Sequence, residues 1–328
     1  MIIRLFRTHQ NVQLLVFLLA ALLLWGDGFY RQQAPVETGL FSPFYTLVFG
    51  WAFPWPWFTV VLAFLMVVGG AYLFNLILVE EGMSPRNTFL PAVLYLLFFS
   101  FSPGLLKLHP AIPANLLFLL ALRMILKSRH FETAYAQTFS AAILISLASF
   151  FDIYYSIFFF VIWVSLVLYR SYTWREWIIS FLGLITPYFY LACYYFFTDQ
   201  LFPAGRLYAG FLSSLRPLAA DYHFPVPLYV VWGWLALFVV IAFFKLLSTQ
   251  SERVIQLRKA FMIIVWTYLL GVAAAVWVPQ QVETNLALTF LPSAVFLASW
   301  MQSVKRSYFI EGMFWVLIAG MIYLKMAL

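Results

Sequence analysis

Apolar residues follow one another in long runs along nearly the whole chain, and short polar stretches separate these runs. A helix needs about 20 consecutive apolar residues to cross the hydrocarbon of a bilayer, and most of the runs approach that length. The pattern therefore predicts an all-α polytopic membrane protein with about eleven transmembrane helices. The expected helices cover residues 10–26, 57–79, 88–106, 112–127, 136–151, 153–169, 177–197, 226–247, 260–278, 284–301 and 309–327.

The positive charges are distributed unevenly between the two sides that this threading defines. Fourteen of the 19 Lys and Arg residues fall on the side of the N-terminus, and five fall on the other side. Short cytoplasmic loops of membrane proteins are enriched in Lys and Arg, so we expect a cytoplasmic N-terminus and, after an odd number of spans, an external C-terminus. The five external cations are Arg31, Lys107, Arg206, Arg216 and Lys325.

The composition excludes an ordinary water-soluble globule. Hydrophobic residues make up 65% of the chain and charged residues only 9%, whereas roughly a quarter of a soluble domain is charged. The net charge of +7 is explained by the sidedness of the cations and their attraction to anionic headgroups, so no nucleic-acid partner is expected. Because the single cysteine, Cys193, lies in an apolar run, it offers neither a disulfide nor a thiolate metal site. Residues 1–328 show no repeat or linker and are expected to form a single transmembrane domain.

Two of the expected external loops are long. The first covers residues 26–56 and contains the apolar stretch 41–51, which is too short to cross the bilayer and is expected to lie along the interface. The second covers residues 198–225 and places apolar and basic residues on opposite faces of a helix. We therefore expect interfacial helices in the first and fourth external loops, and any elaborated function on the external side.

Two acidic residues, Asp27 and Asp152, are candidates for chemistry because a carboxylate at membrane depth is costly and marks a functional site by default. Asp27 directly follows the first expected span and has glycine on both sides. It could act as a general base on a hydroxyl acceptor, bind a divalent cation, or simply end the helix in a turn. Asp152 lies between two closely joined spans and is expected to cap a helix, with a polar cavity or a proton relay as the alternatives.

Basic residues of the external loops supply the other half of a candidate substrate-binding site. The planar guanidinium of arginine presents a fork of donors to phosphate, so a lipid phosphate at the outer interface would need such a partner. Anchoring to lipid headgroups is the alternative for each of these residues. The histidines show no metal-ligand spacing, and the chain lacks the signatures of phosphate-binding loops, zinc proteases and serine hydrolases. The substrate-binding candidates are Arg206, Arg216, His223, Lys107 and His109.

The order of these features resembles the GT-C superfamily of integral-membrane glycosyltransferases, which use polyprenyl-phosphate sugars. The segment GDGFYRQQA, with Asp27 and Tyr30, looks like a shortened form of that family's acid-acid-x-x-Tyr motif. The block EEGMSPRNTFLPAVLYLLFFSFSPGLLKLHPAIPANLLFLLALRMILKSR is similar to the superfamily's third and fourth spans, where a Ser-Pro ends one helix and a basic cluster follows the next. The similarity in layout covers roughly residues 5–200. The chain also resembles an uncharacterised bacterial family of multi-pass membrane proteins.

The resemblance to GT-C implies an activity. A sugar would pass from a polyprenyl-phosphate donor to a lipid or protein acceptor at the external face, with Asp27 as the catalytic base and Arg206 or Arg216 at the donor phosphate. The chain also departs from the family's pattern, because Gly28 stands where many relatives have a second acid and Asn115 where an acid is often found. The sequence shows no counterpart of the large external C-terminal domain of many relatives. The fold could therefore be kept and the catalysis lost. Whether the site uses no cofactor or a divalent cation is left open.

Two other classes of function stay open. A non-catalytic membrane subunit or scaffold of an envelope-assembly or secretion complex is favoured by the missing second acid. A lipid or solute transporter is the third class, although transporters often contain two related halves and the sequence shows no such symmetry. The expected partners are membrane lipids, a polyprenyl-phosphate-linked sugar and, for the scaffold, another membrane protein. The expected location is the bacterial inner (cytoplasmic) membrane.

Overall fold

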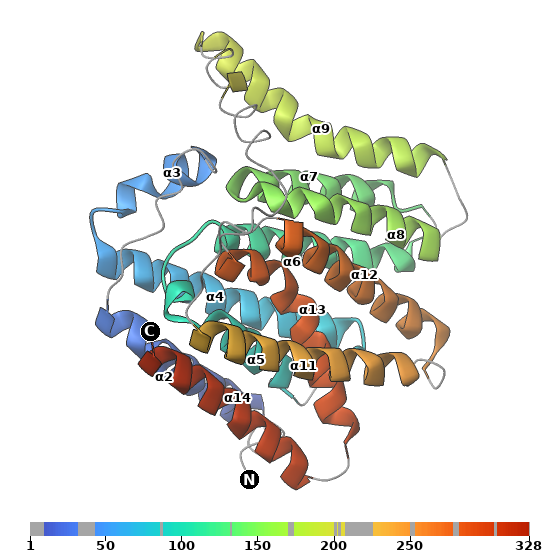
Figure 1. Ribbon diagram of the computed structural model, residues 1–328. Coiled ribbons are helices and arrows are strands. Elements are labelled where there is room, and N and C mark those ends of the chain that lie inside the picture. The colour runs from blue at the N-terminus through green and yellow to red at the C-terminus, as the bar shows by residue number, and fades with distance from the viewer. Residues whose placement is uncertain are drawn as a thin grey trace.

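The computed structural model describes residues 10–31, 43–85, 88–131, 133–169, 174–199, 202, 205–206, 226–249, 253–277, 282–304 and 307–327. Every regular element in these ranges is a helix (Figure 1), so the prediction of an all-α protein is confirmed. The longer helices are α2 (Gln10–Arg31), α4 (Pro56–Glu80), α5 (Leu90–Phe99), α6 (Ala111–Lys127), α7 (Tyr135–Phe151), α8 (Phe159–Tyr169), α9 (Trp174–Phe197), α11 (Val226–Ser248), α12 (Ile255–Trp277), α13 (Val282–Ser303) and α14 (Ser307–Ala327). The shorter elements are α3 (Pro43–Phe49) and the 3-10 helices η1 (Gly50–Ala52), η2 (Pro103–Leu105), η3 (Ser128–His130) and η4 (Ile153–Phe158).

Each expected span coincides with one of the longer helices, but the helices differ in their capacity to cross a membrane. Among the described residues, seven helices are long and apolar enough to do so. The helix α5, the helix α7 and the continuous segment η4–α8 are shorter apolar helices of 10–17 residues. The multi-pass helical character is thus found, and the count of eleven spans stays a prediction. The seven candidate spans are Gln13–Arg31, Pro56–Glu80, Ala111–His130, Trp174–Phe197, Tyr229–Ser248, Ile255–Ala275 and Asn285–Ser303.

The helices run side by side in a bundle with two distinct ends (Figure 1). At one end, α2 and α14 both finish, and α3 lies nearby together with the connection between α5 and α6. We call this the Asp27 end. At the opposite end, which we call the Glu80 end, the end of α4 meets α6 and η3. The first expected external loop and the connection between α5 and α6, which contains Lys107 and His109, therefore both begin at the Asp27 end.

The burial of each helix follows from its place in the bundle. Every residue of α5 is buried, which fits a helix that is apolar on all faces. In the α13 span, 78% of the residues are buried, whereas only 17% are buried in α9, at the edge of the bundle. The edge helix still packs closely on α7, because Gly183 brings the two backbones together: a Cβ at this position would lie 2.7 Å from the carbonyl oxygen of Phe139.

Two of the predicted boundaries that differ from the structure bear on the region around Asp27. The first helix was expected to end at residue 26, but α2 continues to Arg31, so Asp27 lies inside the helix. An ion pair between Asp27 and Arg31 spans one helical turn. The positive charge of Arg31 also interacts favourably with the negative, C-terminal end of the helix dipole. The third helix was expected to reach residue 106, but α5 ends at Phe99. Pro103 disfavours helical geometry in the residue before it, and the 3-10 helix η2 begins there instead.

The two expected interfacial helices have different outcomes. In the first external loop the structure contains α3, whose Tyr45 is fully buried and donates a hydrogen bond to the carbonyl oxygen of Leu108 at 3.0 Å. Leu47 on the same helix is 69% exposed, so α3 has an inward and an outward face. The helix expected within residues 198–225 falls almost entirely outside the described residues.

Candidate functional site

Asp27 lies one turn before the end of α2, in a small ionic cluster. The Nε of Arg31 donates a hydrogen bond to the Oδ1 of Asp27 at 2.9 Å, and the Nη2 of Arg31 donates to the backbone oxygen of Lys325 at 2.8 Å. The Nζ of Lys325 donates to the carbonyl oxygen of Leu24 at 2.6 Å. The cluster of Asp27, Arg31 and Lys325 therefore ties α2 to α14.

The two carboxylate oxygens of Asp27 differ in their hydrogen bonding. The Oδ2 atom is buried and has no hydrogen-bond partner within the described part of the chain, while the side chain as a whole is 24% exposed. A buried carboxylate oxygen without a partner is costly. A proton donor at this oxygen would remove that cost.

Gly28 explains why the chain lacks a second acid next to Asp27. A Cβ at position 28 would lie 3.1 Å from the Cβ of Leu106 and 3.2 Å from its carbonyl oxygen. The connection between α5 and α6 thus fills the space that a side chain would need. Lys107, which follows Leu106 and is only partly exposed, is brought to the Asp27 end by the same contact.

His109 lies in the interior rather than at the interface. It is fully buried, its ring stacks on Phe99 with ring centroids 6.3 Å apart, and neither ring nitrogen has a hydrogen-bond partner among the described residues. Burial, helped by the positive charge of Lys107, lowers the pKa of His109 to about 3. A neutral, enclosed imidazole does not face lipid headgroups, and its assignment to the substrate stays a prediction.

The remaining substrate-binding candidates are not brought to Asp27 by any described contact. Arg206 is exposed, and no ion pair within the described ranges involves it. Arg216 and His223 lie outside the described residues. The cation beside Asp27 is instead Arg31, which the i,i+4 spacing on a longer α2 would have indicated. Nothing in the sequence signals Lys325, because it is 294 positions from Arg31.

Asp152 caps a helix, as predicted. Its Oδ1 accepts a hydrogen bond from the backbone N–H of Tyr154 at 3.2 Å, at the start of η4. Although Asp152 keeps some exposed surface, protein surrounds its carboxylate. Burial raises the pKa of Asp152 to about 7, and the hydrogen bond from Tyr154 opposes that rise.

Asn115 is the centre of a buried polar network close to the Asp27 end. Its Oδ1 accepts from the hydroxyl of Tyr95 at 3.0 Å. Its Nδ2 donates to the hydroxyl of Tyr155 and to the carbonyl oxygen of Ala287, both at 3.2 Å. The amide therefore joins α5, α6, η4 and α13, and all its described contacts are structural.

The Glu80 end contains a separate set of ion pairs. Arg123 holds Glu80 through two hydrogen bonds of 3.2 and 2.9 Å. Arg129 pairs with Glu81 at 2.7 Å, and the Glu81 side chain is only 3% exposed. These pairs fasten α4 to α6 and η3, and sequence reasoning did not single them out.

The described residues contain no group of three or more His, Cys, Asp and Glu side chains that could hold a metal ion. The divalent cation named as one alternative therefore has no ligand cluster among the described residues.

The helices and their exposed apolar faces place the chain in the class of all-helical, multi-pass membrane proteins. Comparison of the chain with known protein families, with curated proteins and with solved structures gives no match. The resemblance to the GT-C superfamily thus rests on the sequence motifs around Asp27 and in residues 80–129.

Proposed function

We propose that the protein is a membrane glycosyltransferase that moves a sugar from a polyprenyl-phosphate donor to a lipid or protein acceptor at the external face. The observation that carries this proposal is the carboxylate of Asp27. Arg31 holds one of its oxygens, and the other is buried without a described partner. A carboxylate that is oriented through one oxygen and has no partner at the other is suited to take a proton from an acceptor hydroxyl.

In this reaction the acceptor hydroxyl gives its proton to the Oδ2 of Asp27. The acceptor oxygen forms a bond to the anomeric carbon of the sugar as the bond from that carbon to the phosphate oxygen breaks. Polyprenyl phosphate leaves with the electron pair. The positive charges of Arg31 and Lys325 in the same cluster would stabilise the phosphate as its charge develops, and Arg206 and Arg216 stay candidates for the same task.

The test replaces Asp27 with asparagine. We expect D27N protein in lipid nanodiscs to transfer labelled sugar from a panel of polyprenyl-phosphate hexoses about 10²-fold more slowly than the wild type or worse, the loss typical of a general base. The matched control is Asp199→Asn, because Asp199 is exposed and has a φ of 54°, a conformation that asparagine tolerates well.

Both variants are first checked for a monodisperse gel-filtration profile and an unchanged melting temperature. Full activity of a folded D27N protein would refute the assignment of the base. Absence of transfer by the wild type with every donor would refute the enzyme.

A structural subunit of a membrane complex is the second candidate function. The specific observation in its favour is that Asp27, Arg31 and Lys325 close on one another and tie α2 to α14. Holding the two helices together would by itself be a sufficient role for such a cluster. In that case D27N lowers stability, no donor is turned over, and a stoichiometric partner protein co-purifies with the chain.

A further inference from the structure

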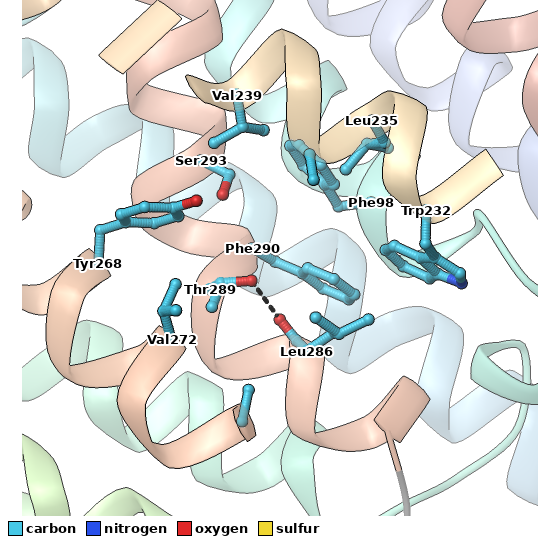
Figure 2. A pocket seen from close by; sticks show the side chains of 12 residues that line it. Phe98, Trp232, Leu235, Val239, Tyr268, Val272, Leu286, Thr289, Phe290 and Ser293 are labelled. Carbon is cyan, nitrogen blue, oxygen red and sulfur yellow. Dashed lines mark hydrogen bonds between the residues drawn. The ribbon is translucent and has the colours of Figure 1, made fainter. Parts of the chain in front are cut away.

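A pocket of about 210 Å³ lies between α11, α12 and α13, away from the Asp27 cluster (Figure 2). The helices α11 and α12 form its two sides. Leu286, Phe290 and Ser293 of α13 form its floor, with Phe98 of α5 beneath. It is partly open, and no residue of the proposed glycosyl transfer lines it.

The helices α11 and α12 both pack on α13, and α11 also packs on α14. Gly271 lets α12 approach the backbone of α13 so closely that a Cβ would lie 2.9 Å from the carbonyl oxygen of Leu288. Gly320 of α14 lies against α11, where a Cβ would meet the ring of Trp234 at 3.4 Å. Small residues allow such close helix contacts in membranes. The two helices are consecutive in the chain and both rest on α13, and the pocket is the space left between them over that helix.

The wall of the pocket is mainly apolar. The Nε1 of Trp232 is buried without a described partner, but in Figure 2 it points away from the other lining side chains. None of its lining residues is charged. The hydroxyl of Thr289 is already used, because it donates to the carbonyl oxygen of Leu286 at 2.7 Å, and Figure 2 shows the hydroxyls of Tyr268 and Ser293 turned toward one another. A buried water needs about two to four polar partners, and a charged headgroup would lose its hydration without compensation. An apolar occupant therefore fits this wall best.

The surroundings of the pocket supply such an occupant. The lining residues of α11 lie at the middle of that helix, and both α11 and α12 are candidate membrane spans. Leu237 and Phe244 of α11 and Leu269 of α12 are exposed, so in a bilayer their faces meet lipid chains. An apolar cavity of roughly 150 Å³ is large enough to take up benzene. The present pocket can therefore hold a short stretch of one chain.

We infer that this pocket binds one acyl chain of a membrane phospholipid, which enters sideways from the bilayer. Phospholipid chains surround the exposed faces of α11 and α12 in a bilayer, so a chain can reach the opening of the pocket without crossing water. The headgroup stays at the interface, because the pocket has no partner for it. This site does not depend on the proposed glycosyl transfer.

Photo-crosslinking tests the inference on the full-length protein in nanodiscs that contain a phospholipid with a diazirine in its acyl chain. Mass spectrometry then locates the adducts. In the wild type we expect label on Val272 and Phe290, inside the pocket. Ala275→Phe should lower this labelling about fivefold or more, since a phenyl ring fills much of the available volume.

The control is Ala273→Phe, the same substitution two positions away on α12 at an exposed residue that does not line the pocket. It should leave the labelling unchanged. If Ala275→Phe fails to fold, Ala236→Phe provides the same test, because Ala236 lines the pocket but is exposed at its rim.

Three results would overturn the inference. One is label spread evenly over the exposed faces of α11 and α12, with no excess in the pocket. Another is pocket labelling that persists in Ala275→Phe or Ala236→Phe. The third is displacement of the label by polyprenyl phosphate at concentrations at which added phospholipid has no effect, which would assign the pocket to an isoprenoid chain instead.

Discussion

Asn115 shows what a single amide can do in an apolar interior. It is 1% exposed and makes hydrogen bonds with Tyr95, Tyr155 and the backbone of Ala287. Removing one partner of a buried hydrogen bond costs more than the bond contributes, because the group left behind loses both the bond and water. The network is therefore sensitive to small changes.

At this scale we predict that Tyr95→Phe destabilises the protein by about 1–3 kcal/mol, the cost of a buried acceptor without a partner. The phenylalanine keeps the ring in place but leaves the Oδ1 of Asn115 without its described donor. The measurement is the apparent melting temperature in detergent, which should fall.

The control for this change is Tyr190→Phe on α9, which removes a hydroxyl from a side chain that is 69% exposed. It should leave the melting temperature unchanged. An equal melting temperature for Tyr95→Phe and the wild type would mean that the Tyr95–Asn115 bond contributes no stability.

The attachment of α9 is the clearest case at the scale of elements. This helix buries little of its surface and rests on α7 at Gly183, where a Cβ would lie 2.7 Å from both the Cβ of Ala142 and the carbonyl oxygen of Phe139. Backbone atoms cannot move aside as a flexible side chain can. The separation of the two helices is therefore set by the glycine.

We predict that Gly183→Ala pushes α9 away from α7 and destabilises the protein by about 1–3 kcal/mol, as overpacking does in tight contacts. Gly233→Ala on α11 is the matched control, since no atom lies within 4 Å of a Cβ placed there. That control should be neutral or stabilising, because alanine favours helix by up to about 1 kcal/mol over glycine. Thermal unfolding of the two variants decides the question, and equal stability of Gly183→Ala and the wild type would contradict the prediction.

At the scale of the whole molecule, contacts at the Asp27 end bring together residues that the charge pattern places on one side. Arg31 meets the end of α14, and both were expected outside the cytoplasm. Arg123 and Arg129, expected inside, lie together at the Glu80 end. These contacts agree with the sides expected for the ends of α2, α4, α6 and α14. The number of spans and their orientation in the membrane stay predictions.

Cysteine labelling tests that orientation. In a Cys193→Ser background, Tyr30→Cys and Thr198→Cys should react with an impermeant maleimide added outside intact cells, since both positions are exposed at helix ends on the predicted external side. Ser303→Cys, at an exposed position at the other end of the bundle, should react only after the membrane is opened. Labelling of Tyr30→Cys and Thr198→Cys from opposite sides would exclude a shared external site.

The sequence was sufficient to locate the helices, because a long apolar run has few alternatives once each span must satisfy its own backbone. It was insufficient at Asp27, where the flanking glycines indicated a helix end but α2 continues to Arg31, which pairs with Asp27. The sequence also could not predict the contact of Lys325 with α2 or the pocket between α11 and α12, because both depend on how helices pack against one another. Helix packing depends on the shapes of the contacting surfaces, which apolar periodicity does not record.

The contact between Arg31 and the backbone of Lys325 has a consequence for biosynthesis. The two residues are 294 positions apart, so α2 leaves the ribosome and enters the membrane long before its partner is translated. Until α14 is inserted, the Nη2 of Arg31 and the carbonyl of Leu24 lack the groups of Lys325 that they bind in the finished protein. The cluster around Asp27 is thus among the last features of the protein to be completed.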